Sequence, residues 1–132
     1  MAWVDGYFTS QEFACRCGCG AGTDRQDVSD VLLRKLNDLR TLIGPVVLTS
    51  AARCVAHNQR EGGKTNSAHL TIPGKIPCKA VDIRVTDPQH RAKVITGVQA
   101  VGFVRRGEAR SFIHVDVGEP PMYPQHVVWT YA

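Results

Sequence analysis

The sequence predicts an α+β fold in which N-terminal helices pack on one face of a small antiparallel sheet. Apolar residues recur every three or four positions over residues 28–43, which is the period of an amphipathic helix. Apolar and polar residues alternate over 80–85 and again over 112–117, which is the period of a half-buried strand. Because the clearest helix comes early and the strands come late, helices and sheet are expected to form separate layers.

The length and composition indicate one globular domain spanning residues 1–132. A content of 43% hydrophobic and 21% charged residues excludes disordered, collagen-like and coiled-coil proteins. No apolar run approaches the roughly 20 residues of a membrane span. The first residues lack a basic start followed by an apolar stretch, so no signal peptide and a cytoplasmic location are expected.

The first predicted element is the helix over residues 28–43. Asp27 is positioned to cap its start. Gly44 suits the left-handed conformation that ends helices, and Pro45 cannot continue the hydrogen-bond ladder. A β-prone stretch over 46–49 is expected to follow.

Residues 50–79 are polar and rich in glycine, asparagine, serine and proline, which predicts a long irregular segment. Loops of this length inside a compact domain are usually functional. The strand predicted over 80–85 follows, and its alternation places Asp82 on the face that points away from the core.

An Asp-Pro pair predicts the start of a second helix, over 88–101. The alternation over 112–117 then places His114 and Asp116 together on the non-core face of a strand. The last predicted strand covers 127–131. No internal repeat accompanies these elements.

Three residues are candidate metal ligands: His69 in the long loop, and Asp82 and His114 on the two alternating strands. If these strands are neighbours, their polar faces coincide. Two imidazoles and one carboxylate around zinc leave a fourth position for water, which is the arrangement of a catalytic site. The pattern alone is equally compatible with a surface histidine, a solvated carboxylate and a hydrogen-bonded sheet histidine.

Several short segments in a fixed order add to this pattern. They are Ser50-Ala51-Ala52-Arg53-Cys54, His57-Asn58, Gly62-Gly63, Asn66-Ser67-Ala68-His69-Leu70, Lys79-Ala80-Val81-Asp82-Ile83 and Phe112-Ile113-His114-Val115-Asp116-Val117-Gly118. With the N-terminal Phe13-Ala14-Cys15-Arg16-Cys17-Gly18-Cys19, the sequence resembles the zinc peptidases of the M15 family over nearly its whole length. That family includes D-alanyl-D-alanine carboxypeptidases and phage peptidoglycan endopeptidases.

The resemblance implies a fold like that of hedgehog domains and D-Ala-D-Ala peptidases, with Zn²⁺ held by His69, Asp82 and His114. It also implies that Arg53 faces the substrate carbonyl and stabilises the oxyanion, a role suited to a permanent cation with a planar fork of donors. The implied function is hydrolysis of an amide bond in the peptidoglycan stem peptide. Carboxypeptidase and endopeptidase action both remain open.

The general base is a separate question, because hydrolysis needs a group that takes a proton from water. Many relatives have an acid three residues before the last histidine ligand, where this sequence has Ser111. Asp116 is the preferred candidate. Glu108 is the second, since hedgehog domains carry a glutamate at that offset. The alternative for Asp116 is a carboxylate that orients a histidine.

One departure from the family pattern is the segment 71–78, which is longer than the usual turn between the first histidine and the aspartate. A surface loop and a flap over the substrate cleft are both compatible with it. Two other functions also stay open: a non-catalytic zinc-binding domain that acts in protein interaction, and a phage structural protein.

Five cysteines cannot all pair with one another, and Cys15, Cys17 and Cys19 crowd together. These three could bind a second zinc ion with Cys54 or a histidine, although the spacing is tight and the usual Cys-Xaa-Xaa-Cys pair is missing. Without a signal peptide we expect mostly thiols. A bridge between Cys54 and Cys78 is the alternative if the protein works outside the cell.

The charge pattern bears on partners. Sixteen basic and twelve acidic residues give a net charge of +4, and the basic residues are scattered, so nucleic-acid binding is not expected. A modest positive charge favours the anionic cell wall. We expect a monomer that acts on the stem peptide after another factor releases it, or that is carried in a virion.

Overall fold

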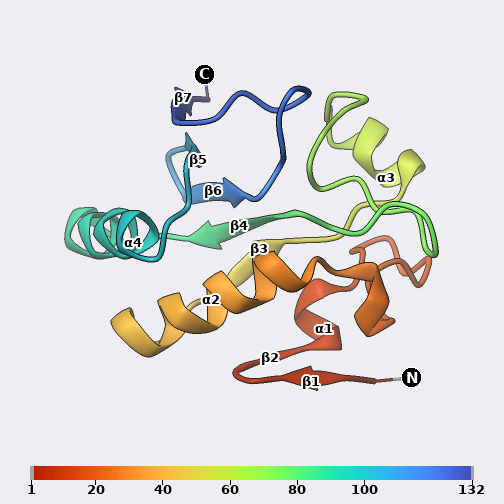
Figure 1. The fold of residues 1–132 in the computed structure, drawn as a ribbon, viewed down its shortest axis with the longest axis horizontal. Coiled ribbons are helices and arrows are strands. Elements are labelled where there is room, and N and C mark those ends of the chain that lie inside the picture. Colours follow the sequence, from red (N-terminus) through yellow and green to blue (C-terminus); the bar gives the residue numbers. More distant parts are fainter. Residues whose placement is uncertain (1, 132) are drawn as a thin grey trace.

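The computed structural model describes residues 2–131 (Figure 1). The strands within this range are β1 (Val4–Asp5), β2 (Phe8–Thr9), β3 (Leu48–Ser50), β4 (Ala80–Arg84), β5 (Arg105–Glu108), β6 (Phe112–Asp116) and β7 (Val127–Thr130). The helices are α1 (Ser10–Phe13), α2 (Asp30–Ile43), α3 (Val55–Arg60) and α4 (Pro88–Ala100), with a short 3₁₀ turn at Arg25–Asp27. The predicted α+β class is confirmed.

The central sheet has five strands in the order β3-β4-β6-β5-β7, and β1 and β2 form a separate hairpin. The pairs β3–β4, β4–β6 and β6–β5 are antiparallel, whereas β5 and β7 are parallel. The sheet is therefore mixed at one edge rather than wholly antiparallel. The reason is that β6 ends beside the start of β5, and the segment 117–126 turns back there, so that β7 begins beside the start of β5 and runs in the same direction.

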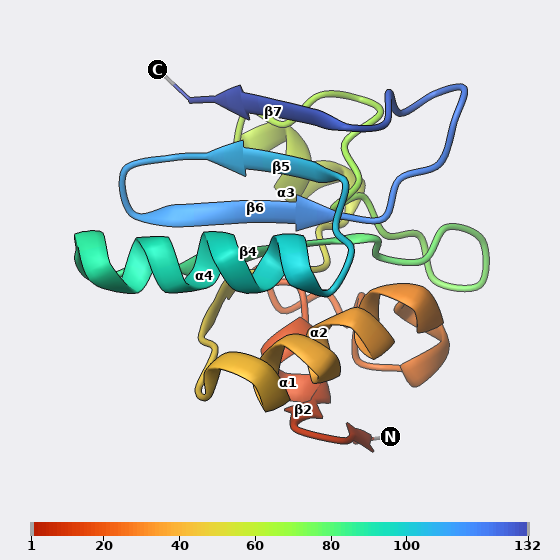
Figure 2. The same cartoon turned by 60° about the vertical axis from the view of Figure 1, so that its left-hand side comes forward.

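Helices α2 and α4 cover one face of the sheet, and α3 lies on the other side of it (Figure 2). The core between α2, α4 and the sheet contains fully buried side chains from each, namely Leu32, Leu36, Leu39, Val81, Ile83, Val94, Val98, Ile113 and Val115. No helix of the described residues is long and apolar enough to cross a membrane. The other face of the sheet is left for polar side chains.

Helix α2 begins two residues later than the sequence pattern suggests. Ser29, not Asp27, caps it by accepting a hydrogen bond from the Leu32 backbone N–H at 3.2 Å. The chain is still extended at Val28, which pairs with Cys78 in an isolated bridge. The Asp27 carboxylate instead accepts a hydrogen bond from the Gly22 backbone N–H at 3.0 Å.

Helix α4 begins as predicted, with Asp87 accepting from the His90 N–H at 2.8 Å and Pro88 in the first turn. Its interior glycine has a packing reason. A Cβ at Gly97 would lie 2.7 Å from side-chain carbons of Leu39 and Ile43. The glycine therefore lets α4 approach α2 closely.

The cysteines are all unbonded thiols in the described part of the chain. Cys78 is buried, and its Sγ donates to the Ala80 carbonyl at 3.1 Å. Cys54 lies instead at the start of α3, close to Cys15 and Cys17. The alternative of a bridge between Cys54 and Cys78 is therefore not realised.

Candidate functional site

The register of β4 and β6 brings two predicted ligands face to face. Asp82 lies directly opposite His114, and Ala80 lies opposite Asp116. Directly opposed residues point to the same side of a sheet. The pairs Val81–Val115 and Ile83–Ile113 point to the other side, into the core under the helices. The strand alternation thus puts Asp82, His114 and Asp116 on the face away from α2 and α4.

Two short backbone contacts place His69 and Arg53 beside each other over this polar face. The Arg53 N–H donates to the His69 carbonyl at 3.0 Å, and the Thr71 N–H donates to the Arg53 carbonyl at 2.8 Å. These bonds form a parallel bridge between Arg53 and Leu70. The long irregular segment is therefore fixed where it carries the functional side chains.

The three predicted ligands converge on a small triangle of atoms. His69 Nε2 lies 3.2 Å from Asp82 Oδ1 and 3.2 Å from His114 Nδ1, and His114 Nδ1 lies 3.1 Å from Asp82 Oδ1. Ligands at about 2.0–2.1 Å from a tetrahedral zinc ion stand about 3.3 Å from one another. The triangle has this size, so these atoms could hold one metal ion.

The outer nitrogen of each ring is already engaged. His69 Nδ1 lies 2.7 Å from the Ala51 carbonyl oxygen, and His114 Nε2 lies 2.7 Å from Asp116 Oδ2. Because a carbonyl and a carboxylate only accept, each ring must donate its N–H there. When both rings are neutral, the remaining nitrogen of each carries a lone pair that faces the other ring and the Asp82 oxygen. Two such lone pairs and a carboxylate oxygen form a donor set suited to a cation.

The site is almost closed to solvent, with His69, Asp82 and His114 only 3%, 4% and 5% exposed. Burial lowers the pKa of His69 despite the nearby Asp82 carboxylate. Burial opposes ionisation of Asp82, but its hydrogen bonds with both histidines hold the pKa below its usual range. For His114, hydrogen bonds to Asp116 and Asp82 outweigh burial and raise the pKa. A buried anion thus faces two imidazoles.

Asp116 uses both carboxylate oxygens. Oδ2 accepts from His114, while Oδ1 accepts from Arg105 Nε at 2.6 Å and from the Gly118 backbone N–H at 2.9 Å. The residue is 2% exposed and lies behind His114, on the side away from the ligand triangle. This geometry favours the alternative role of a carboxylate that orients a histidine, in place of the preferred role of general base.

Glu108, the second candidate base, is not brought to the site. It pairs with Ile113 across β5 and β6, so its side chain leaves the sheet on the core side, opposite to His114. Its Oε2 accepts from Arg106 Nε at 2.8 Å on that side. Glu108 therefore finds no support as a base in this geometry.

Arg53 lies at the edge of the ligand triangle. Its Nη2 is 3.5 Å from Asp82 Oδ2, the oxygen that does not face the histidines, and its Nε donates to Ser50 Oγ at 3.2 Å. The guanidinium keeps further N–H donors beyond these two contacts. Such a cation can stabilise negative charge that develops on a substrate oxygen.

Arg105 and strand β7 complete the site in a way that the alternation of apolar and polar residues does not predict. Trp129 on β7 packs against the His114 ring, with centroids 5.3 Å apart, and the Arg105 guanidinium lies 5.1 Å from the Trp129 ring centre. A Cβ at Gly107 would lie 2.4 Å from the Trp129 indole nitrogen, so glycine makes this packing possible. The sequence pattern predicts only a strand over 127–131.

The segment 71–78 forms a tight hairpin turn, in which Ile72 and Ile76 exchange backbone hydrogen bonds at 2.8 Å. It projects at the end of the sheet where β4 begins (Figures 1 and 2). Ile76 and Pro77 line a hollow of about 420 Å³ together with Tyr123. None of the three candidate metal ligands lines this hollow, although Ala68 and Leu70, the two neighbours of His69 in the chain, do.

Comparison with known proteins gives the family of the chain. Among curated proteins, none matches the chain. A protein-family model described as Peptidase M15 matches residues 6–116, which include Arg53 and all three members of the ligand triangle. The match covers most of the chain, and the protein therefore belongs to the peptidase M15 family.

Proposed function

We propose that this peptidase is zinc-dependent and hydrolyses an amide bond in the stem peptide of bacterial peptidoglycan. The observation that carries the proposal is the convergence of His69, Asp82 and His114, whose ligand atoms lie 3.1–3.2 Å apart while the outer ring nitrogens contact the Ala51 carbonyl and the Asp116 carboxylate. Three protein ligands leave one position open, as catalytic zinc sites do and structural sites do not.

When bound, zinc would supply a Lewis acid that polarises a carbonyl and lowers the pKa of water. The chain's own residues supply the frame for this chemistry. Ala51 and Asp116 fix the ring orientation and tautomer of His69 and His114. Asp82 adds the one negative charge among the ligands. In this proposal Asp116 is a positioning residue.

Arg53 would act on the substrate side. Its guanidinium stands next to Asp82 and keeps N–H donors free for the carbonyl oxygen that becomes negative during attack. Its hydrogen bond to Ser50 and its backbone bond to His69 hold it in place before substrate binds. Such preorganisation avoids a reorganisation cost during the reaction.

Family membership supports a peptidoglycan substrate, because M15 peptidases as a group include peptidoglycan carboxypeptidases and endopeptidases. The net charge of +4 is compatible with approach to an anionic wall. We propose action at the cell wall, after release by another factor or delivery in a virion.

The test is digestion of purified peptidoglycan with the zinc-loaded protein, followed by mass spectrometry of the muropeptides and assay of new free amines. Cleavage that a chelator stops and zinc restores is the expected result, and the mass of the products separates terminal from internal cleavage. His114→Ala should abolish both zinc retention and cleavage. His126→Asn, at an exposed histidine with a φ of 58°, is the matched control and should leave both intact.

A second candidate function is supported by the position of the two acids. Asp116 is fully engaged behind His114, and Glu108 leaves the opposite face of the sheet. A zinc-binding domain that presents a surface to a protein partner needs the ligands but no base. Full zinc loading without new amines from any peptidoglycan would favour this function over hydrolysis.

A further inference from the structure

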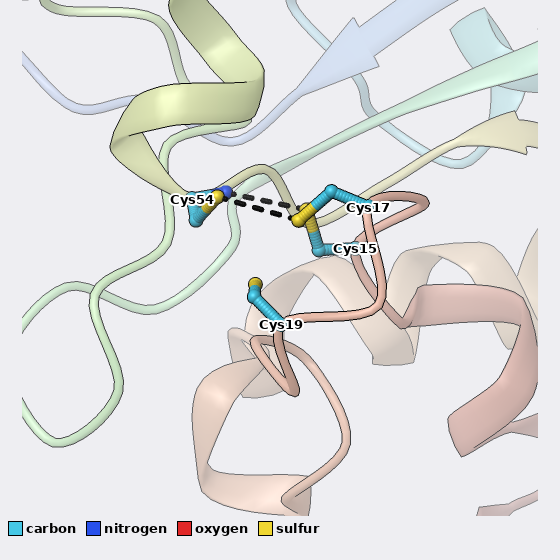
Figure 3. A group of neighbouring side chains, drawn as sticks. All are labelled: Cys15, Cys17, Cys19 and Cys54. Atoms are coloured by element: carbon cyan, nitrogen blue, oxygen red, sulfur yellow. Dashed lines mark hydrogen bonds between the residues drawn. The ribbon is translucent and has the colours of Figure 1, made fainter.

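A second group of metal-ligating side chains lies outside the ligand triangle. Four cysteine sulfurs, from Cys15, Cys17, Cys19 and Cys54, all lie within 4.8 Å of one another (Figure 3). Three come from the N-terminal segment after α1, and the fourth comes from the start of α3, far away in the sequence. We propose that these four residues form a structural site for one zinc ion.

The distances fit a single tetrahedral ion. Cys15 Sγ and Cys17 Sγ are 3.4 Å apart, and Cys17 Sγ and Cys54 Sγ are 3.6 Å apart. Zinc–sulfur bonds of about 2.3 Å place tetrahedral sulfurs about 3.8 Å from each other. A disulfide requires sulfurs at about 2.05 Å. In iron–sulfur clusters four cysteines are distributed over two or four iron atoms, so four sulfurs that all lie within 4.8 Å of one another favour one ion.

The backbone is shaped to aim the sulfurs at one point. Gly18 and Gly20, which follow two of the cysteines, have φ values of 82° and 97°. Glycine adopts this conformation without strain, so the chain can reverse after each cysteine. The Gly18 N–H also donates to the Cys15 carbonyl at 3.0 Å, closing the first of these turns. This explains how alternate cysteines, with no Cys-Xaa-Xaa-Cys pair, can reach a common centre.

Backbone N–H groups also point at the sulfurs. The Cys54 N–H donates to Cys15 Sγ at 3.5 Å, and the His57 N–H donates to Cys54 Sγ at 3.4 Å. Such donors stabilise the negative charge of thiolates. Each thiol that binds zinc gives its proton to solvent. All four positions of the ion are filled by the chain, which is typical of a structural rather than a catalytic site.

The site would add a metal link between two parts of the protein that already touch, since the Ala52 N–H donates to the Phe13 carbonyl at 3.1 Å. Cys54 caps α3 and directly follows Arg53, while Cys15 and Cys17 follow α1. A metal ion at this point would hold the start of α3 against the N-terminal segment. Because Cys54 and Arg53 are adjacent, the ion would also limit movement of the Arg53 backbone.

The experiment is zinc analysis of the full chain purified in the presence of zinc and a reductant. The expected zinc content is about two ions per chain in the native protein. It should fall to about one ion in the double variant Cys17→Ser/Cys54→Ser, and likewise to about one in the double variant His69→Ala/His114→Ala. Cys78→Ala removes a buried cysteine outside the cluster and should leave the content unchanged. Equal zinc in the native protein and the Cys17/Cys54 variant would overturn the proposal.

Cobalt(II) provides a readout that does not depend on activity or on the folding of the cysteine variant. The His69→Ala/His114→Ala protein loaded with cobalt should show the intense near-ultraviolet charge-transfer absorption of thiolate ligands. Absence of that band overturns the proposal, as does finding the four cysteines in disulfides after anaerobic purification with zinc. Neither result bears on the His69, Asp82 and His114 site, so the two proposals fail separately.

Discussion

Replacing Asp116 with asparagine separates an orienting role from a proton-accepting role. The carboxylate accepts from His114 Nε2 at 2.7 Å, from Arg105 Nε at 2.6 Å and from the Gly118 N–H at 2.9 Å. An asparagine side chain has one oxygen and one NH₂ group. Whichever way the amide is turned, its NH₂ group therefore faces at least one of these donors.

The consequence for the metal site follows from the His114 tautomer. If the asparagine NH₂ group faces the ring, Nε2 must accept, and the ring proton moves to Nδ1, the atom of the ligand triangle. If the NH₂ group faces Arg105 instead, the partly buried Arg105 guanidinium loses the acceptor of its ion pair. Loss of such an outer partner lowers metal affinity by about 10–100-fold, or about 1.4–2.7 kcal/mol.

The measurement is zinc affinity by competition with a chromogenic chelator, combined with peptidoglycan cleavage at increasing zinc concentration. We expect weaker zinc binding and recovery of much of the cleavage at saturating zinc. Asp38→Asn, the same change at an exposed residue of α2, should alter neither. Unchanged zinc affinity with cleavage lost at saturating zinc would refute this reasoning and identify Asp116 as the base.

Four further outcomes are expected. Arg53→Ala should keep its zinc but cut turnover by about 10²–10³-fold, and parallel measurement of metal content and kcat checks this. Glu108→Gln should cleave peptidoglycan as the native protein does, because Glu108 leaves the other face of the sheet; a large loss of cleavage with zinc retained would restore it as the base. Leu36→Ala in the fully buried core should lower the free energy of unfolding in urea by about 2–5 kcal/mol, and a change below about 1 kcal/mol would argue against the packing described. Rising salt should slow cleavage of intact walls more than cleavage of a soluble stem peptide, whereas equal slowing would exclude a role for the net charge of +4.

The polar face of the sheet could be predicted from the sequence, because the alternation of apolar and polar residues within one strand determines which side chains share a face. Alternation alone put Asp82 on one face of its strand, and put His114 and Asp116 on one face of theirs. The pairing of the two strands is not local, since it depends on which residues of β4 and β6 lie opposite each other. The family resemblance supplied the ligand set that alternation left open.

Strand β5 was missed because its sequence, Arg105-Arg106-Gly107-Glu108, lacks the apolar alternation of a strand. Arg105 forms an ion pair with Asp116 of β6 on one face, and Arg106 forms one with Glu108 of the same strand on the other. Without the register of β5, the face of Glu108 could not be known. Helix α3 was missed for a similar reason, because a helix of six residues is too short for a clear helical period.

The segment 50–54 explains how an irregular loop can hold a precise site. The Ala51 carbonyl orients the His69 ring, and the Arg53 backbone forms hydrogen bonds with the backbone of His69 and Thr71. The Cys54 sulfur lies in the cysteine cluster. Strands β4 and β6 fix the other two ligands by their register. Ligand geometry is therefore determined on one side by the sheet and on the other by this segment. If the segment 50–54 were free to move, His69 and Arg53 would both leave their positions at the site. The contact of Cys54 with the N-terminal cysteines therefore bears on the chemistry of the site.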